Sequence, residues 1–200
     1  MKLSTFKIGG IHPSDNKLTA DIACVAAALP KTAVFPLSQH IGAPAKPVVK
    51  KGDHVCVGTL LAEAGGFVSA PVHSSVSGTV VKIDSVYDAS GYRRLAVIVN
   101  VEGDEWLPQI DRSDKIETLD AHPEFTPEEI IERIKVAGIT GMGGAGFPSF
   151  IKLMPPPGAK VECVILNGVE CEPYITSDYR LMLEHADEIV VGLKLLMKAV

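Results

Sequence analysis

The spacing of hydrophobic residues changes along this 200-residue chain, and the changes predict two folded units of different kinds. Between residues 48 and 83, short apolar runs alternate with glycine, proline, serine and aspartate, as in a small all-β sandwich or barrel. One more strand is expected at residues 95–101, whereas the rest of residues 84–124 is charged and irregular. Beyond residue 125 the apolar period becomes helical.

The first expected helix has clear start and stop signals. Thr126 is followed by a proline at the first helical position and by Glu129 three residues on, which together form a capping box. Ile130 and Ile134 then recur on one face, and Gly138 ends the helix. A short second helix is expected at residues 148–153.

A longer helical pattern follows near the end of the sequence. It begins at Ser177 or Asp178, breaks near His185 and continues to Val200 without a stop signal, so we expect the protein to extend further. These patterns divide the chain into an N-terminal segment at 1–34, a β domain at 35–102, a linker at 103–125 and an incomplete α/β domain at 126–200. The predicted fold class is therefore multi-domain α+β.

Two polar loops carry the candidate chemistry. The glycine loop, residues 141–147, reads Gly-Met-Gly-Gly-Ala-Gly-Phe, and its glycines let the backbone lie flat against a planar ligand. The apolar residues 161–166 predict a buried strand, which the acidic loop, residues 167–173, follows as Asn-Gly-Val-Glu-Cys-Glu-Pro. The glycine loop alone also fits a tight turn, and it matches neither a Walker A loop nor the dinucleotide fingerprint.

Together the two loops resemble the flavin-binding, NADH-oxidising subunit of respiratory complex I, whose loop reads Gly-x-Gly-Gly-Ala-Gly-Phe-Pro. The acidic loop is more similar to that of the RnfC family, whose members are components of the Rnf electron-transport complex. Residues 9–13, Gly-Gly-Ile-His-Pro, and residues 39–44, Gln-His-Ile-Gly-Ala-Pro, also resemble opening elements of RnfC. The resemblance thus extends over nearly all of the chain.

The resemblance implies an α/β domain that binds FMN and NADH and passes electrons on to iron–sulfur clusters. Lys152 and Asn167 would hydrogen-bond the flavin, and Phe147 would stack on adenine. Glu172 would accept from the ribose hydroxyls of NADH. The resemblance implies no catalytic side chain and no metal ligand, and its cofactor-binding residues are Gly141, Gly143, Gly144, Gly146, Phe147, Lys152, Asn167, Glu170 and Glu172.

The whole protein is then expected to be an NADH/FMN-dependent subunit of a membrane-bound, ion-translocating NAD:ferredoxin oxidoreductase. Its partners would be the other Rnf subunits, NAD(H) and, indirectly, ferredoxin, at the cytoplasmic face of the cell membrane. The 4Fe-4S motifs of the family and part of its flavin pocket are expected in a C-terminal part. We therefore expect residues 1–200 alone to be inactive.

The β domain suggests a function of another class. Residues 49–55, Val-Lys-Lys-Gly-Asp-His-Val, resemble the lipoyl and biotinyl carrier fold. A carrier needs an exposed lysine at its hairpin tip, but no lysine occurs at residues 52–81, and the expected tip is Gly65-Gly66-Phe67. We interpret the β domain as a rigid docking module.

Two further alternatives remain. One is a soluble flavoprotein reductase of the cobalamin reductase type, in which the β domain would follow the flavin domain. The other is a non-enzymatic docking module in which both loops are structural.

The composition of the chain argues against several other classes of protein. A net charge of −5, with 19 lysines and arginines spread thinly, argues against binding to nucleic acid. Four cysteines at positions 24, 56, 163 and 171 have no metal-ligand spacing and predict reduced, mostly buried thiols. Residues 1–7 are too polar for a secretory leader, and no apolar run reaches the roughly 18 residues that span a bilayer.

Overall fold

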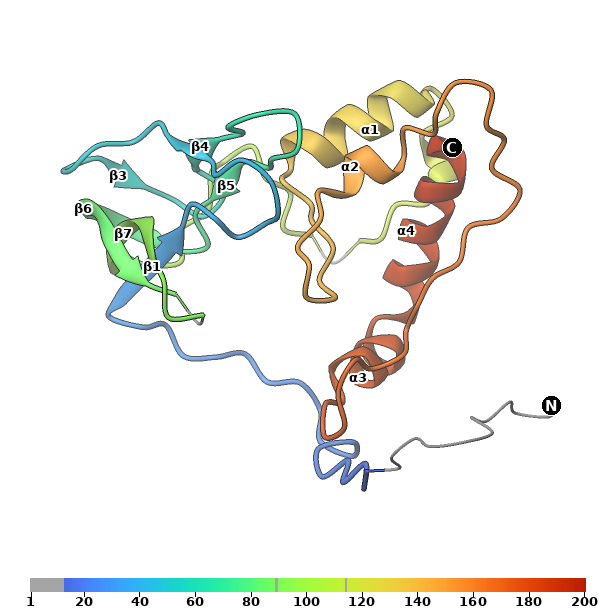
Figure 1. Cartoon of the computed structure of the whole chain (residues 1–200), viewed down its shortest axis with the longest axis horizontal. Coiled ribbons are helices and arrows are strands. Elements are labelled where there is room, and N and C mark those ends of the chain that lie inside the picture. The colour runs from blue at the N-terminus through green and yellow to red at the C-terminus, as the bar shows by residue number, and fades with distance from the viewer. Residues whose placement is uncertain (1–12, 89, 114) are drawn as a thin grey trace.

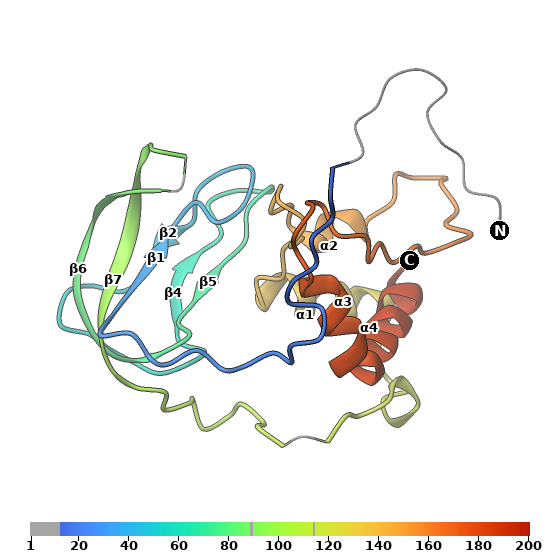
Figure 2. The same cartoon turned by 90° about the horizontal axis from the view of Figure 1, so that it is seen from below.

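The computed structural model describes residues 13–88, 90–113 and 115–200, in which a β domain and a group of helices lie side by side (Figure 1). The polar residues 1–7 and most of the motif at residues 9–13 lie outside this described part. The connecting residues 104–125 pass around one edge of the molecule, as Figure 2 shows, and contain the short 3-10 helix η1 (Leu119–Ala121).

Two antiparallel sheets form the β domain. The first sheet has the strand order β1-β7-β6-β3 and the second has the order β2-β4-β5. The strands are β1 (Thr32–Pro36), β2 (Lys46–Pro47), β3 (His54–Val55), β4 (Leu60–Glu63), β5 (Val72–His73), β6 (Ser77–Tyr87) and β7 (Arg93–Gly103).

One apolar core holds the β domain together. The four consecutive residues 96–99 of β7 are buried, because β1 and β6 pair with this strand on either side. The predicted β sandwich and the predicted strand at 95–101 are thus confirmed. The buried cluster consists of Phe35, Leu37, Ala45, Val55, Leu61, Ala62, Val72, Val76, Val80, Val97 and Val99.

The expectation that residues 84–87 are irregular was wrong. β6 continues through these polar residues to Tyr87, which pairs with Arg93 of β7. The two strands leave the core together as a ribbon, so the sheet hydrogen bonds continue where the apolar pattern has already ended.

α1 (Pro127–Val136) begins with the predicted capping box. The Thr126 hydroxyl accepts from the Glu129 amide at 3.2 Å, and the Glu129 carboxylate accepts from the Thr126 amide at 2.9 Å. Ile130 is buried, and the chain leaves the helix through Gly138 at φ +70°. The short α2 (Ser149–Lys152) forms within the predicted range.

The C-terminal helical pattern is interrupted where the sequence predicted. α3 (Ser177–Glu184) and α4 (Ala186–Ala199) are separated at His185. α4 packs against α1, and the cluster between them contains Ile130, Leu153 and Ala199.

The start of α3 differs from the expectation. Its N-cap is Thr176, not Ser177 or Asp178, and the Thr176 side chain makes no capping hydrogen bond. The Thr176 hydroxyl instead lies 2.6 Å from the hydroxyl of Thr19, which ties the segment before β1 to α3. The side chain at this helix start is therefore engaged by a residue 157 positions away in sequence.

The predicted buried strand at residues 161–166 is absent. These residues are extended, but they pair with no strand of the described part of the chain, and Ile165 is 84% exposed. A strand needs a hydrogen-bonded neighbour. The apolar run instead borders a groove of about 690 Å³ between α1, α2 and α4.

The β domain and the helices touch at defined points. The ring of Phe67, in the loop between β4 and β5, meets the ring of Phe150 in α2 edge to face at 6.4 Å. A Cβ on Gly138 would lie 2.5 Å from the Pro71 carbonyl oxygen, so only glycine permits this close contact. The hairpin tip thus contacts α2 through the Phe67 ring, although 68% of Phe67 stays exposed.

Candidate functional site

The glycine loop is closed at its base by backbone pairing. The Gly141 amide donates to the Phe147 carbonyl at 2.8 Å, and the Ser149 amide donates to the Ile139 carbonyl at 2.9 Å. Thr140 and the residue after Phe147 form an antiparallel bridge. Because α1 and α2 flank this base, the loop projects from a fixed point.

The tip of the glycine loop is open. Gly144 has φ +96° and Gly146 has φ +58°, conformations that favour glycine over any other residue. A Cβ on Gly143 or Gly144 would meet nothing within 4 Å, and the Met142 side chain is 96% exposed. The backbone of the tip is therefore accessible to a flat ligand.

Lys152 of α2 places a positive charge beside this loop. Its Nζ lies 5.7 Å from the centre of the Phe147 ring and 3.8 Å from the position of a Cβ on Gly141. The fold thus brings Gly141, Phe147 and Lys152 together. Such a group offers a backbone surface, an aromatic ring and a cation to one ligand.

The acidic loop lies with α3. The Asn167 carboxamide oxygen accepts from the Val169 amide at 3.0 Å, and the Glu170 carboxylate accepts from the amide of Tyr179 at 3.0 Å. Glu170 therefore satisfies an amide in the first turn of α3, the role that the Thr176 side chain does not fill.

Glu172 lies beside the segment before β1. Its backbone carbonyl accepts from the Lys17 ammonium group at 3.4 Å. Among the described residues, no hydrogen bond joins Asn167, Glu170 or Glu172 to the glycine loop, and Glu170 lines a different cavity from the one beside that loop. The candidate residues thus form two groups within the described part of the chain.

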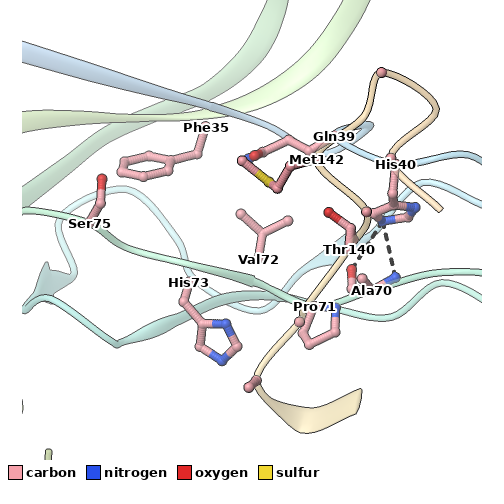
Figure 3. A pocket seen from close by; sticks show the side chains of 15 residues that line it. Phe35, Gln39, His40, Ala70, Pro71, Val72, His73, Ser75, Thr140 and Met142 are labelled. Carbon is pink, nitrogen blue, oxygen red and sulfur yellow. Dashed lines mark hydrogen bonds between the residues drawn. The ribbon is translucent and has the colours of Figure 1, made fainter. Parts of the chain in front are cut away.

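A cavity of about 520 Å³ lies between the glycine loop and the β domain. Figure 3 shows its side chains, with Gln39, His40 and His73 contributed by the β domain and Thr140 and Met142 by the residues of and next to the glycine loop. Sequence alone predicted that His40 and His73 are ordinary structural or surface histidines, because neither has a partner carboxylate nearby in sequence. Gln39 was noticed only within the run at residues 39–44, which resembles a family.

The cavity is close to neutral. Its lining includes no lysine, arginine, aspartate or glutamate of the described residues. Burial lowers the pKa of His73, which favours the uncharged imidazole. His40 is buried, and its ring nitrogens bond the backbone of Ile41 and Ala70. These features suit an uncharged ring better than a free phosphate.

The cysteines make no metal or disulfide site in the described residues. All four thiols are unpaired, and no group of three metal-ligating side chains forms within the described ranges. The expected burial was wrong, because Cys24, Cys163 and Cys171 are exposed and Cys56 is half-buried.

Comparison with known families covers both units. A model of the RnfC barrel sandwich hybrid domain matches residues 4–104, and a model of the Nuo51 FMN-binding domain matches residues 134–200. The chain belongs to the RnfC family. The second match includes the whole of the glycine loop and the acidic loop. The predicted resemblance and fold class are thereby confirmed.

Individual relatives agree with the family assignment. The RnfC-type component of the Na(+)-translocating ferredoxin:NAD(+) oxidoreductase complex of Acetobacterium woodii is 45% identical over all of this chain, which spans 44% of that relative. Its counterpart in the proton-translocating complex of Clostridium ljungdahlii is also 45% identical, over 98% of this chain and 42% of the relative. The counterpart in the ion-translocating oxidoreductase complex of Rhodobacter capsulatus is 40% identical, over 98% and 38%.

The chain spans less than half the length of these curated relatives. Within the described residues, no helix has both the length and the apolar character needed to cross a membrane.

Proposed function

We propose that this chain is the flavin-proximal part of an electron-transfer subunit in an ion-translocating ferredoxin:NAD oxidoreductase complex. The observation that carries the proposal is the match of residues 134–200 to an FMN-binding domain, with an open glycine loop near the start of the matched range. The names of the RnfC relatives, all components of such complexes, support the same function.

The glycine loop fits the role of one wall of an FMN pocket. Backbone at Gly143 and Gly144 faces open space that a Cβ would fill, and Lys152 adds a cation for an anionic group of the ligand. Bound there, FMN would exchange a hydride with NAD(H) and release electrons singly. Gly141, Gly146 and Phe147 would complete this wall.

The acidic loop would serve the same pocket from α3. Glu172 would accept from ribose hydroxyls of NAD(H), and Asn167 would hydrogen-bond the flavin. Glu170 would line the region between flavin and nicotinamide while keeping its bond to the amide of Tyr179. This assignment requires the acidic loop to face the glycine loop across the bound cofactors.

We further propose the division into a segment at 1–34, a β domain at 35–102, a linker at 103–125 and an FMN/NADH domain at 126–200. The 4Fe-4S clusters would lie in sequence that the longer relatives possess. The protein would sit at the cytoplasmic face of the membrane, bound to the other Rnf subunits.

The alternatives have less support. In a cobalamin reductase type of flavoprotein the β domain would follow the flavin domain, whereas here the barrel sandwich hybrid match comes first. A covalent carrier would need a lysine at the loop between β4 and β5, which contains none. A purely structural docking module does not explain why the tip of the glycine loop is open.

The proposal is tested on protein expressed from the complete gene. After reconstitution with FMN and removal of oxygen, addition of one equivalent of NADH should bleach the flavin absorbance. A protein that binds no FMN, or whose FMN stays oxidised with excess NADH, would contradict the proposal. The docking-module alternative expects no flavin at all.

A further inference from the structure

We infer that residues 39–41 and 70–71 of the β domain form a brace, which holds the glycine loop in place. His40 joins the two segments of this brace and so positions it. The inference rests on the proposed function, since its consequence is an effect on FMN affinity. It assigns to the β domain a part in cofactor binding beyond docking.

The chain contacts the brace at two places, Gly138 before the glycine loop and Gly146 near the end of the loop. Before the loop, a Cβ on Gly138 would lie 2.5 Å from the Pro71 carbonyl oxygen. Near the end of the loop, a Cβ on Gly146 would lie 2.8 Å from the Gln39 carbonyl oxygen. The Ile41 amide donates to the Gly146 carbonyl at 3.3 Å. Two glycines therefore permit backbone contact with two separate segments of the β domain.

His40 joins these two segments to each other. Its Nδ1 lies 3.1 Å from the Ile41 carbonyl oxygen. Its Nε2 lies 3.1 Å from both the amide nitrogen and the carbonyl oxygen of Ala70, the residue before Pro71. Only 9% of the residue is exposed, so its hydrogen bonds do not compete with much water. Dashed lines in Figure 3 mark the bonds to Ala70.

Further contacts fix the segment after His40. The Ala43 amide donates to the Val68 carbonyl at 2.9 Å, and the Ser69 hydroxyl donates to the Ala43 carbonyl at 2.8 Å. Gly42 turns the chain at φ +99° against Val68. These bonds give a structural reason for the run Gln-His-Ile-Gly-Ala-Pro at residues 39–44.

The brace holds the chain at Gly138, before the loop, and at Gly146, near its end, and leaves the tip at Gly143 and Gly144 open for a ligand. A loop that is already ordered loses less conformational entropy when it binds, so holding its ends strengthens binding without touching the ligand. His40 is therefore a positioning residue for FMN, acting through residues 41 and 70 on the loop.

The test compares two substitutions of His40 in protein expressed from the complete gene. In His40→Gln the longer amide can still bond Ala70, whereas in His40→Asn the shorter amide can bond only residue 41. We expect His40→Asn to weaken FMN binding roughly three- to thirtyfold and His40→Gln to change it by less than about threefold. His54→Asn, at an exposed histidine of the same domain, should leave the FMN affinity unchanged.

Hydrogen–deuterium exchange supplies a readout that general destabilisation would not give. In His40→Asn, peptides covering residues 139–149 should exchange faster, while peptides from β6 and β7 exchange as in the unmodified protein. Uniform acceleration across the β domain, or FMN affinity equal to that of the unmodified protein, would overturn the brace.

Two outcomes separate the brace from the function it serves. If the unmodified protein binds no FMN, the proposed function fails and the brace with it. If it binds FMN and His40→Asn binds equally well, only the brace fails. If His40→Asn does not fold, hydrogen–deuterium exchange of the Ile41 amide in the unmodified protein tests the brace instead. Slow exchange supports its bond to Gly146, and exchange as fast as in an open loop refutes it.

Discussion

Glu170 and Glu172 of the acidic loop have different surroundings. Glu170 has a structural partner, the amide of Tyr179, whereas among the described residues the Glu172 carboxylate has neither an ion pair nor a hydrogen bond. A carboxylate with no partner of its own is available to a ligand. The assignment of ribose binding to Glu172 therefore implies a specific kinetic effect.

Glu172→Gln should weaken the binding of NADH more than the binding of FMN. An amide replaces only part of the charge-assisted bonds from two ribose hydroxyls, a loss on the order of 1.5–3 kcal/mol, or roughly ten- to a hundredfold. The measurement is the NADH concentration dependence of flavin reduction in protein from the complete gene. Glu162→Gln, an exposed carboxylate before the acidic loop, is the control. Equal NADH dependence in both variants would remove Glu172 from the site.

At the scale of elements, local signals predicted some parts of the fold and missed others. The capping box at Thr126 and Glu129 was predictable, because each interaction spans three residues. The fate of residues 161–166 was not, because strand formation depends on a neighbour that the apolar pattern does not specify. The contact of the α3 N-cap residue Thr176 with Thr19 was likewise not predictable, because it joins residues far apart in sequence.

The capping box of α1 should contribute to stability. Thr126→Ala removes the acceptor for the Glu129 amide and should lower the free energy of unfolding by about 0.5–2 kcal/mol. Thr118→Ala is a matched control, since Thr118 precedes η1 without a side-chain capping bond. Urea denaturation of both variants gives the difference. Equal loss in the two would show that the box does not stabilise α1.

Glu117, His122 and Glu124 of the linker form a hydrogen-bonded cluster whose contribution to stability depends on pH. Hydrogen bonds to Glu117 at 2.6 Å and Glu124 at 3.2 Å raise the pKa of His122, and the bond to His122 lowers the pKa of Glu117. The contribution of His122 to the free energy of unfolding is complete below pH 6.5. It is lost as the pH rises through the pKa of His122 in the folded protein, which is higher than 6.5. The contribution of Glu117 to the free energy of unfolding is complete above pH 4.5. It is lost as the pH falls through the pKa of Glu117 in the folded protein, which is lower than 4.5.

NMR titration of the histidine ring protons tests this cluster. His122 should titrate with a midpoint above 6.5, and Glu117→Gln should lower that midpoint. His185, whose pKa is raised by Glu188 instead, should titrate identically in both proteins. A His122 midpoint at or below 6.5 in the unmodified protein would refute the cluster.

For the whole molecule, sequence and structure agree on the order of units but not on how they form a site. The proximity of Lys152 to the glycine loop was predictable, because Lys152 follows the contiguous loop motif closely in sequence. The position of Gln39, His40 and His73 beside the loop was not predictable, because no local pattern marks a residue that reaches the loop only through the packing of two domains. The acidic loop was predicted beside the glycine loop, yet its present bonds are to α3.

The β domain should carry no covalent cofactor. The intact mass of the protein purified from its native host should equal the mass of the unmodified chain, because the loop between β4 and β5 contains no lysine that could be acylated. A mass increase equal to a lipoyl or biotinyl group would contradict the docking interpretation.

If the glycine loop forms a wall of the FMN site, bound FMN should protect its backbone amides. Hydrogen–deuterium exchange of protein from the complete gene is measured with and without FMN. We expect slower exchange with FMN in peptides covering residues 139–152 and 167–173, and no change in the ends of β6 and β7 at residues 84–87 and 93–95. FMN that slows exchange elsewhere while leaving residues 139–152 unchanged would show that the glycine loop does not bind the flavin.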